Sequence, residues 1–397
     1  MKLSPEAQTA INVITEAGGR PLPVGGCVRD FLLGVESKDI DIEVYGSVKP
    51  EVIQEALSAV GRVDAVGVSF GVLKFGKDVD ISFPRRELKT GEGHGGFSVT
   101  IDQTLDPRQA MLRRDFTVNA LAYDPVRHEV LDYFKGVEHL RARRLVRTSS
   151  AFKEDPLRVL RGVQFAGRFG FSIERETAAL CQSLAEEFET ISIERVWMEW
   201  EKILMKGVSM EAVWIALDST GWLQFFPEWG YGAALETDEI IPLLDRMKIG
   251  GQRRAAIILA SMFRGSSELK SFLGRIDAPR WLRKNSTLLA ATEFPVGRMR
   301  DVQVRILARK MKEIQLTDWL LAHGWTPGSG PWAAALRQGV MTKVLPPFVT
   351  GDSLIERGLE PGPKFSVILE KAIETQDIEG WTTVAQSQEW LDRRLPR

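Results

Sequence analysis

The chain has 397 residues, 44% of them hydrophobic and 26% charged, a composition typical of a globular protein with two to four domains. Its formal net charge of −1 excludes binding to nucleic acid by overall charge, so any such binding must come from local basic patches. No apolar run approaches the roughly 20 residues of a membrane span, and the sequence shows no signal-peptide pattern. Only two cysteines are present. We therefore expect a cytoplasmic protein with no membrane contact and no disulfides.

The first informative segment, residues 25–41, contains a glycine pair, an arginine and two aspartates. Gly25 and Gly26 would let backbone N–H groups approach phosphate oxygens, and Arg29 adds a planar donor fork. The alternation of residues 39–44 predicts a strand with Asp39 and Asp41 on one face. Two carboxylates on one face suit a pair of Mg²⁺ ions about 3.5–4 Å apart, as in nucleotidyl transfer. An isolated Asp-x-Asp is usually a solvated strand face, but the nearby glycines and arginine favour nucleotide chemistry.

Short β-type runs continue to about residue 145. We expect strands at residues 40–44, 72–75, 79–83, 97–101, 120–123 and 130–133, with a helix at 50–60. Residues 90–97 form a glycine-rich loop that lacks the lysine of a P-loop, and it is either a hairpin connector or a mobile lever over a site. The pattern predicts an α+β head built on one mixed sheet.

Residues 113–120, Arg-Arg-Asp-Phe-Thr-Val-Asn-Ala, place charged and amide side chains just before an apolar run. Such a segment could hold a triphosphate and a ribose hydroxyl, and an ordinary charged loop is the alternative interpretation.

Residues 154–161, Glu-Asp-Pro-Leu-Arg-Val-Leu-Arg, open a helix, with Asp155 as N-cap and Pro156 at the first helical position. Asp155 and Arg158 are i, i+3 neighbours, so their side chains can project together as an acceptor beside a donor fork. Cytosine and adenine present an amino donor beside a ring-nitrogen acceptor, and uracil and guanine present the opposite polarity. An Asp/Arg pair could therefore select C and A, although a capped helix with an ion pair is the commoner arrangement.

Beyond residue 150 the pattern is helical almost throughout, and all eleven tryptophans lie at or after Trp197. Residues 192–202 form a further capped helix whose Arg195 and Glu199 we attribute to packing. Residues 141–168 carry a basic excess of six and residues 298–312 an excess of five. We expect neutralisation of Arg305, Arg309 and Lys310 to weaken binding to RNA, although solvated helix faces would have the same composition.

These motifs, in this order, resemble the class II (bacterial-type) tRNA nucleotidyltransferases and the bacterial poly(A) polymerases. The matching segments are Gly-Gly-x-Val-Arg-Asp with Asp-x-Asp, Arg-Arg-Asp-Phe-Thr-x-Asn-Ala, Glu-Asp-Pro-Leu-Arg-x-Leu-Arg and Ser-x-Glu-Arg-Val, and residues 351–363 resemble the tail of the family. The resemblance is dense over the first half of the chain and weak in the middle.

The resemblance implies a seahorse-like molecule with a nucleotidyltransferase mixed-sheet head followed by all-α parts. We expect the head at residues 1–145, a neck with the nucleotide-selecting motif at 146–206, a body at 207–290 and a tRNA-binding tail at 291–397. The implied activity is addition of CCA to the tRNA 3′ end from CTP and ATP, without a template and with Mg²⁺. No obligatory protein partner is implied.

The resemblance also implies a role for each matched residue. Asp39 and Asp41 would hold Mg²⁺ and activate the tRNA 3′-hydroxyl, with Asp80 as a possible third carboxylate. The residues implied to bind the nucleotide are Gly25, Gly26 and Arg29 at the triphosphate, Arg114, Asp115 and Asn119 at triphosphate and sugar, and Asp155 and Arg158 at the base, with Arg161 alongside.

The chain departs from the family in three places. The first is Glu138-His139-Leu140, where the family usually has Asp-Leu, a modest change. After residue 140 the only histidine is His323, which does not precede an aspartate, so we expect no HD-type phosphatase activity. Residues 68–71 read Val-Ser-Phe-Gly where bacterial poly(A) polymerases carry Gly-Arg-Arg-Phe, which favours tRNA maturation. The alternatives are a CC-adding, A-adding or poly(A)-adding relative, a catalytically silent tRNA-binding protein, and a nucleotidyltransferase acting on small molecules.

Overall fold

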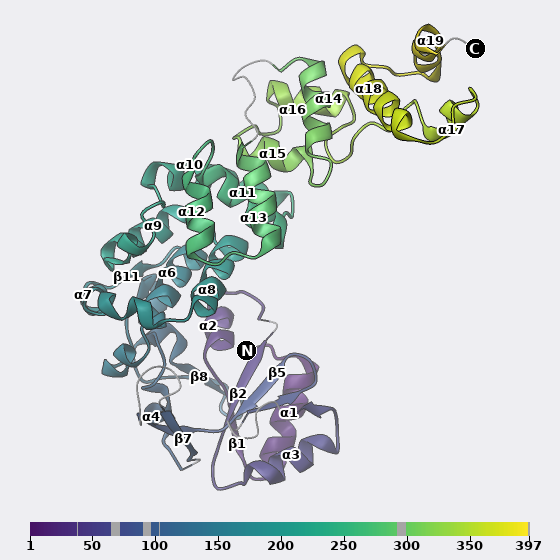
Figure 1. Ribbon diagram of the computed structural model, residues 1–397. Coiled ribbons are helices and arrows are strands. Elements are labelled where there is room, and N and C mark those ends of the chain that lie inside the picture. Colours follow the sequence, from purple (N-terminus) through teal and green to yellow (C-terminus); the bar gives the residue numbers. More distant parts are fainter. Residues whose placement is uncertain (38, 65–71, 90–96, 103, 292–298, 396–397) are drawn as a thin grey trace. The chain divides into compact units, whose positions relative to one another are not determined.

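The computed structural model describes residues 1–397 except 38, 65–71, 90–96, 103, 292–298 and 396–397 (Figure 1). The described chain separates into two compact units. Unit 1 comprises residues 1–203 and 207–225, and unit 2 comprises residues 204–206 and 226–397. The four finer parts expected from the sequence stay a prediction.

A five-stranded mixed sheet is the centre of the first part of unit 1. Its strands lie in the order β1 (Arg20–Pro23), β2 (Ile40–Tyr45), β5 (Val79–Ser82), β4 (Val72–Phe75) and β3 (Val63–Asp64). The pair β2 and β5 is parallel, and the other neighbours are antiparallel. The mixed sheet confirms the predicted α+β head, and the observed strands β2, β4 and β5 match the predicted ones to within one residue.

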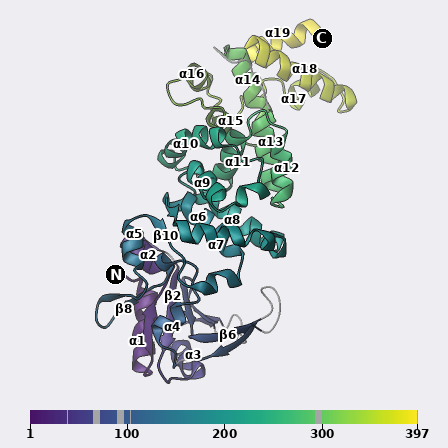
Figure 2. The ribbon, with the colours of Figure 1, turned by 90° about the vertical axis from the view of Figure 1, so that its left-hand side faces the viewer.

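Helices α1 (Pro5–Glu16) and α3 (Pro50–Ser58) pack on one face of this sheet (Figures 1 and 2). Ile11 and Ile14 of α1 and Ile53 of α3 are buried against Ile40 and Ile42 of β2. Since side chains alternate along a strand, the opposite face of β2 is left for polar residues. The packing of the apolar face therefore orients the carboxylates of the other face.

Smaller elements complete the first part of unit 1. They are α2 (Gly26–Leu32), β6 (Arg85–Lys89) paired with β7 (Phe97–Ile101), α4 (Pro107–Met111), the 3₁₀ turn η2 (Thr117–Asn119), β8 (Leu121–Asp124) paired with β9 (Glu129–Asp132), α5 (Gly136–Arg141) and β10 (Arg144–Leu145). The predicted strands at 97–101, 120–123 and 130–133 correspond to β7, β8 and β9, whereas the other elements of this group were not predicted.

The rest of unit 1 is largely helical. It contains η3 (Ser150–Glu154), α6 (Leu157–Phe169), β11 (Ser172–Ile173) paired with β10, α7 (Arg175–Ser183), η4 (Ala185–Thr190), the first part of α8 (Ile193–Lys206), α9 (Met210–Ser219) and η5 (Trp222–Phe225). A Cβ at Gly162 of α6 would lie 2.9 Å from Cζ of Phe116, so the absence of a side chain lets this helix approach the Phe116 ring closely.

Unit 2 is helical in its described residues, as the sequence predicted for the C-terminal part. Its helices are α10 (Tyr231–Arg246), α11 (Gly251–Met262), α12 (Glu268–Arg275), α13 (Arg280–Ala291), α14 (Asp301–Lys310), α15 (Leu316–Ala322), α16 (Gly330–Arg337), α17 (Gly351–Ile355), α18 (Pro363–Glu379) and α19 (Val384–Arg394). A search of the described helices finds none that combines the length and the apolar character needed to cross a membrane.

Candidate active site

The predicted carboxylate pair lies on the face of β2 that α1 and α3 leave uncovered. Asp39, immediately before β2, and Asp41 are accessible to solvent, whereas Ile40 and Ile42 are buried. In the sheet register Asp41 lies opposite Asp80 of β5. The surrounding protein desolvates the Asp41 carboxylate and raises its pKa; the Asp80 and Asp39 charges add to the rise, and Arg114 opposes it. Negative charge is thus concentrated here, which favours a bound cation.

The chemistry of these donors fits a hard divalent ion. Carboxylate oxygens are the ligands that Mg²⁺ prefers, and this ion is usually held by one or two carboxylates together with substrate phosphates and water. Within the described residues, no cluster of three or more histidine, cysteine, aspartate or glutamate side chains is arranged to hold a metal. Asp39 and Asp41 would therefore supply part of a coordination shell that the triphosphate completes. Asp80 instead lies 3.8 Å from the ammonium group of Lys74.

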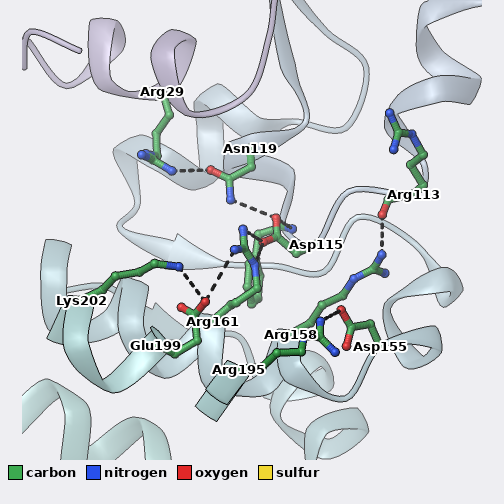
Figure 3. A network of polar contacts seen from close by, with 11 residues as sticks. Arg29, Arg113, Asp115, Asn119, Asp155, Arg158, Arg161, Arg195, Glu199 and Lys202 are labelled. Atoms are coloured by element: carbon green, nitrogen blue, oxygen red, sulfur yellow. Dashed lines mark hydrogen bonds and ion pairs between the residues drawn. The ribbon is translucent and has the colours of Figure 1, made fainter. Parts of the chain in front are cut away.

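Asp115 is the centre of a buried network at the start of η2 (Figure 3). Its Oδ1 accepts hydrogen bonds from the backbone N of Phe116 at 2.7 Å and from Nδ2 of Asn119 at 2.9 Å. Its Oδ2 accepts a hydrogen bond from Nε of Arg161 at 2.8 Å and forms an ion pair with Nη2 of the same residue at 2.7 Å. Burial by itself would raise the pKa of Asp115, but the Arg161 charge and these hydrogen bonds outweigh it and lower the pKa.

The network extends in both directions from Asp115. Asn119 Oδ1 accepts from Nη1 of Arg29 at 2.5 Å, and Arg161 lies 4.0 Å from Glu199, which accepts from Lys202 at 2.8 Å (Figure 3). Three elements that are far apart in sequence, α2, η2 and α6, are thereby held together with α8. Each polar side chain of this network is fixed by another, which pre-organises the site.

Arg29, which we expected at the triphosphate, is 4% exposed, and its guanidinium donates to neighbouring side chains. Its Nε and Nη2 donate to Oδ1 of Asp30 at 2.9 and 2.7 Å. Its guanidinium also lies 4.7 Å from the ring centroid of Phe169. Arg29 therefore positions Asn119 in this structure, and its predicted contact with phosphate remains a prediction.

Gly25 has the conformation that its predicted role requires. Its φ is 75°, in the region that favours glycine, and a Cβ there would lie 2.5 Å from Nη1 of Arg114. The missing side chain thus lets Arg114 approach the backbone before α2. From there its charge acts on Asp41.

The predicted base-reading pair has partners other than those the helical spacing indicated. Arg158 donates to the backbone carbonyls of Ala151 at 2.6 Å and Arg113 at 2.7 Å. Asp155 accepts from Nη2 of Arg195 at 2.8 Å, and its Oδ1 from the backbone N of Leu157 at 3.2 Å (Figure 3). The hydrogen bond to Leu157 is that of the predicted N-cap. Asp155 and Arg158 are therefore neighbours, each oriented by a different group.

One pocket of about 640 Å³ brings most of these residues together. Nine of the eleven predicted site residues line it, all except Gly25 and Asp39. Of the described residues in its lining, nine are basic and three acidic, so the pocket suits a polyanion of nucleotide size. The lining residues outside the predicted set are Arg85, Arg113, Leu157, Gln164, Phe165, Arg168, Arg195 and Lys202.

Some of the missed residues carried a signal in the sequence. Arg113 stands in the predicted motif, and Arg195 was singled out but attributed to packing. Gln164 and Arg168 lie three and seven residues after Arg161, on the same face of α6. The glycine-rich loop and residues 68–71, which the sequence analysis discussed, lie outside the described residues except for Phe97 of β7.

Comparisons with known families match two segments. Residues 23–146 match a family described as the poly A polymerase head domain, and residues 170–231 match one described as a probable RNA and SrmB-binding site of polymerase A. The first segment contains eight of the residues that line the pocket, and the second contains two, Arg195 and Lys202.

Curated relatives match over about the same region. The Multifunctional CCA protein of Neisseria gonorrhoeae (strain NCCP11945) is 38% identical over 186 residues, which are 46% of this chain and 44% of that protein. The protein of the same name from Pasteurella multocida (strain Pm70) is 37% identical over 211 residues, which are 52% and 49% of the two chains. The match spans about half the length of these relatives.

Solved structures share the fold over nearly the whole chain. The Bacillus stearothermophilus CCA-adding enzyme in complex with CTP has a TM-score of 0.70 at 23% identity and covers 99% of each chain. The Thermotoga maritima CCA-adding enzyme complexed with tRNA has a TM-score of 0.63 at 21% identity, covering 98% of this chain and 96% of that one. At these identities the likeness concerns the fold.

Proposed function

We propose that this chain belongs to the family of the class II tRNA nucleotidyltransferases and bacterial poly(A) polymerases and adds CCA to the 3′ end of tRNA from CTP and ATP. The observation that carries this proposal is the single pocket in which Asp41, the Asp115 network and the base-reading residues at the start of α6 meet. The names of the curated relatives and of the solved structures support the same activity.

Nucleotidyltransferases of this family use a divalent metal, and we propose that it is Mg²⁺ held by Asp39 and Asp41. The metal would neutralise charge on the triphosphate and favour the deprotonated 3′-hydroxyl as nucleophile. The raised pKa of Asp41 fits this assignment, since a carboxylate that is desolvated, and that also lies near the charges of Asp80 and Asp39, is stabilised by a bound cation.

The other predicted residues have distinct proposed roles. Arg114, beside Gly25 and close enough to act on Asp41, would bind the triphosphate, and Asp115 would hold Arg161 in place for the same ligand. Asp155 would accept a hydrogen bond from the amino group of cytosine or adenine, and Arg158 would donate to the neighbouring ring nitrogen. The two backbone carbonyls that hold Arg158 fix its donor direction, so a base with the opposite polarity would leave its hydrogen bonds unmade.

The decisive experiment offers the protein tRNA ending before CCA, after C and after CC, with CTP, ATP, UTP or GTP singly and in mixtures, followed by sequencing of the products. We expect C, C and A to be added in that order from CTP and ATP. Addition of C alone, A alone or a long A tail would assign the chain to one of the related activities, and binding without addition would make it a silent tRNA-binding protein.

Two variants test the residue assignments. Asp41→Asn should abolish incorporation and leave tRNA binding nearly intact, whereas Glu51→Gln, which removes an exposed carboxylate on α3, should leave both unchanged. Arg158→Ala should allow incorporation of UTP or GTP. Normal selectivity at normal activity in this last variant would refute the assignment of the base reader.

A further inference from the structure

Gln164 of α6 is a buried polar side chain that the proposed mechanism does not use. The residue is 2% exposed and lines the pocket, and among the described residues its Nε2 has no hydrogen-bond partner. Leaving a buried donor unpaired is unfavourable, so such groups in folded proteins usually have a ligand or water as partner. A pocket-lining position makes a ligand the natural acceptor.

The surroundings of Gln164 indicate what kind of acceptor this is. Arg161 precedes it by three residues and Arg168 follows it by four, so both lie on the same face of α6. Arg168 and Arg29 share one carboxylate, that of Asp30, from which Arg168 is separated by 4.0 Å. Burial and the Arg29 charge lower the pKa of Arg168, in line with two guanidinium groups placed around a single carboxylate. An anion bound here would accept a hydrogen bond from Nε2 of Gln164 and would balance the positive charge of Arg168 and Arg29.

The position along α6 distinguishes the phosphates from the base. Arg158 and Asp155 stand at the beginning of the helix, and Gln164 lies six residues beyond Arg158, about 9 Å along the helix axis. The amino group of Lys202, held by Glu199, borders the same pocket. The pocket thus presents its base-reading groups at one end of α6, and cations with an unpaired amide donor farther along.

We propose that Gln164 donates a hydrogen bond from Nε2 to the β- or γ-phosphate of the bound nucleoside triphosphate, between Arg161 and Arg168. This inference rests on the proposed function, because it takes CTP and ATP as the ligands. Since both nucleotides carry the same triphosphate, Gln164 contributes affinity without contributing to the choice of base.

The test compares the full-length wild type with Gln164→Met and Gln164→Leu, and with Gln182→Met as control, because Gln182 is an exposed glutamine on α7 that donates to the Ser219 carbonyl. Equilibrium binding of CTP, ATP and CMP is measured with Mg²⁺ and without tRNA, so that no turnover occurs. We expect both Gln164 variants to bind CTP and ATP roughly tenfold more weakly and CMP as tightly as the wild type. The control variant should match the wild type throughout.

Four outcomes would overturn the inference. Equal weakening for CMP would place Gln164 at the base, the sugar or the α-phosphate, and weakening for CTP but not ATP would place it at the base. Weaker tRNA binding with unchanged nucleotide binding would make it an RNA contact. Unchanged binding of every ligand would leave it a structural residue. A wild type that binds CTP but extends no tRNA would refute the proposed function alone, so the two failures are distinguishable.

Discussion

The Asp115–Arg161 ion pair offers the sharpest test of how the site is held together. Asp115→Asn retains the shape of the side chain, and its amide oxygen can still accept from Phe116 and Asn119. Its NH₂ group, however, then faces Nε and Nη2 of Arg161, which are 2.8 and 2.7 Å from Oδ2 in the wild type. A charge-assisted hydrogen bond and an ion-pair contact are replaced by donors that face donors.

The expected loss of stability follows from the burial of the two partners. Removing one member of a fully buried pair costs about 3–5 kcal/mol. The side chain of Asp115 is 7% exposed but that of Arg161 is 34% exposed, so water compensates part of the loss, and Glu199 remains 4.0 Å from Arg161. We therefore expect about 2–3 kcal/mol, with the double variant Asp115→Asn/Arg161→Met losing less than the sum of the single variants.

The effect should depend on pH with a defined sign. The pKa of Asp115 is lowered in the folded protein, so the stabilisation by its ionised form is fully present above the unfolded-state pKa of about 3.9 and is lost as the pH falls toward the folded-state pKa. The difference between wild type and Asp115→Asn should be constant from about pH 7 to pH 5 and shrink below about pH 4.

The measurement is hydrogen exchange of the backbone amides of η2 and α6 at several urea concentrations, because a chain with two compact units need not unfold in one step. A destabilisation below about 1 kcal/mol near neutral pH, or one unchanged down to pH 3, would refute the view that this ion pair organises the site.

Three further variants test other contacts. Arg195→Met removes the cation that holds Asp155, so we expect several-fold higher KM values for CTP and ATP in single-nucleotide incorporation, with measurable use of UTP; unchanged kinetics would contradict this. Glu43→Gln removes the charge of a residue only 1% exposed that is paired with an arginine, and should lower the stability of unit 1 by about 2–3 kcal/mol in the same exchange experiment. Arg309→Met breaks a bidentate pair with Asp377 and should destabilise α14 and α18 without changing the salt dependence of tRNA binding; a shallower salt dependence would show a phosphate contact instead.

The contacts of Arg309 show why the charge composition of a segment is a weak guide to a phosphate-binding surface. The basic excess at residues 298–312 led us to expect a phosphate-binding surface that includes Arg305 and Arg309. In the structure Arg305 donates to the carbonyl of Asp377 and to Gln338, and Arg309 to the carboxylate of Asp377. A count of charges along the chain does not include partners that lie 68 or 72 residues away. We therefore expect neutralisation of these arginines to lower stability, and its effect on RNA binding stays a prediction.

Local periodicity was a better guide than composition because it depends on residues close in sequence. Alternating apolar residues predicted β2, and with it the shared face of Asp39 and Asp41, since a strand has only two faces. The resemblance implied Asp80 as a possible third carboxylate, but periodicity alone does not place it opposite Asp41, because the register between β2 and β5 depends on tertiary packing. Likewise, Arg29 could be recognised as a donor, but not as one that Asp30 and Asn119 already occupy.

The residues proposed to read the base show why contacts between distant segments, which the sequence does not reveal, matter for function. Helical spacing correctly placed Asp155 and Arg158 beside each other, but the ends of long side chains go to whichever acceptor is nearest, and here that acceptor belongs to other segments. Asp155 is oriented by Arg195, 40 residues later on α8. In the proposed function, a base bound to Asp155 would share this carboxylate with Arg195, so selection between C or A and U or G would depend on how α8 places Arg195 beside Asp155. Substitutions that shift α8 without touching the pocket should accordingly alter base choice before they reduce the rate of transfer.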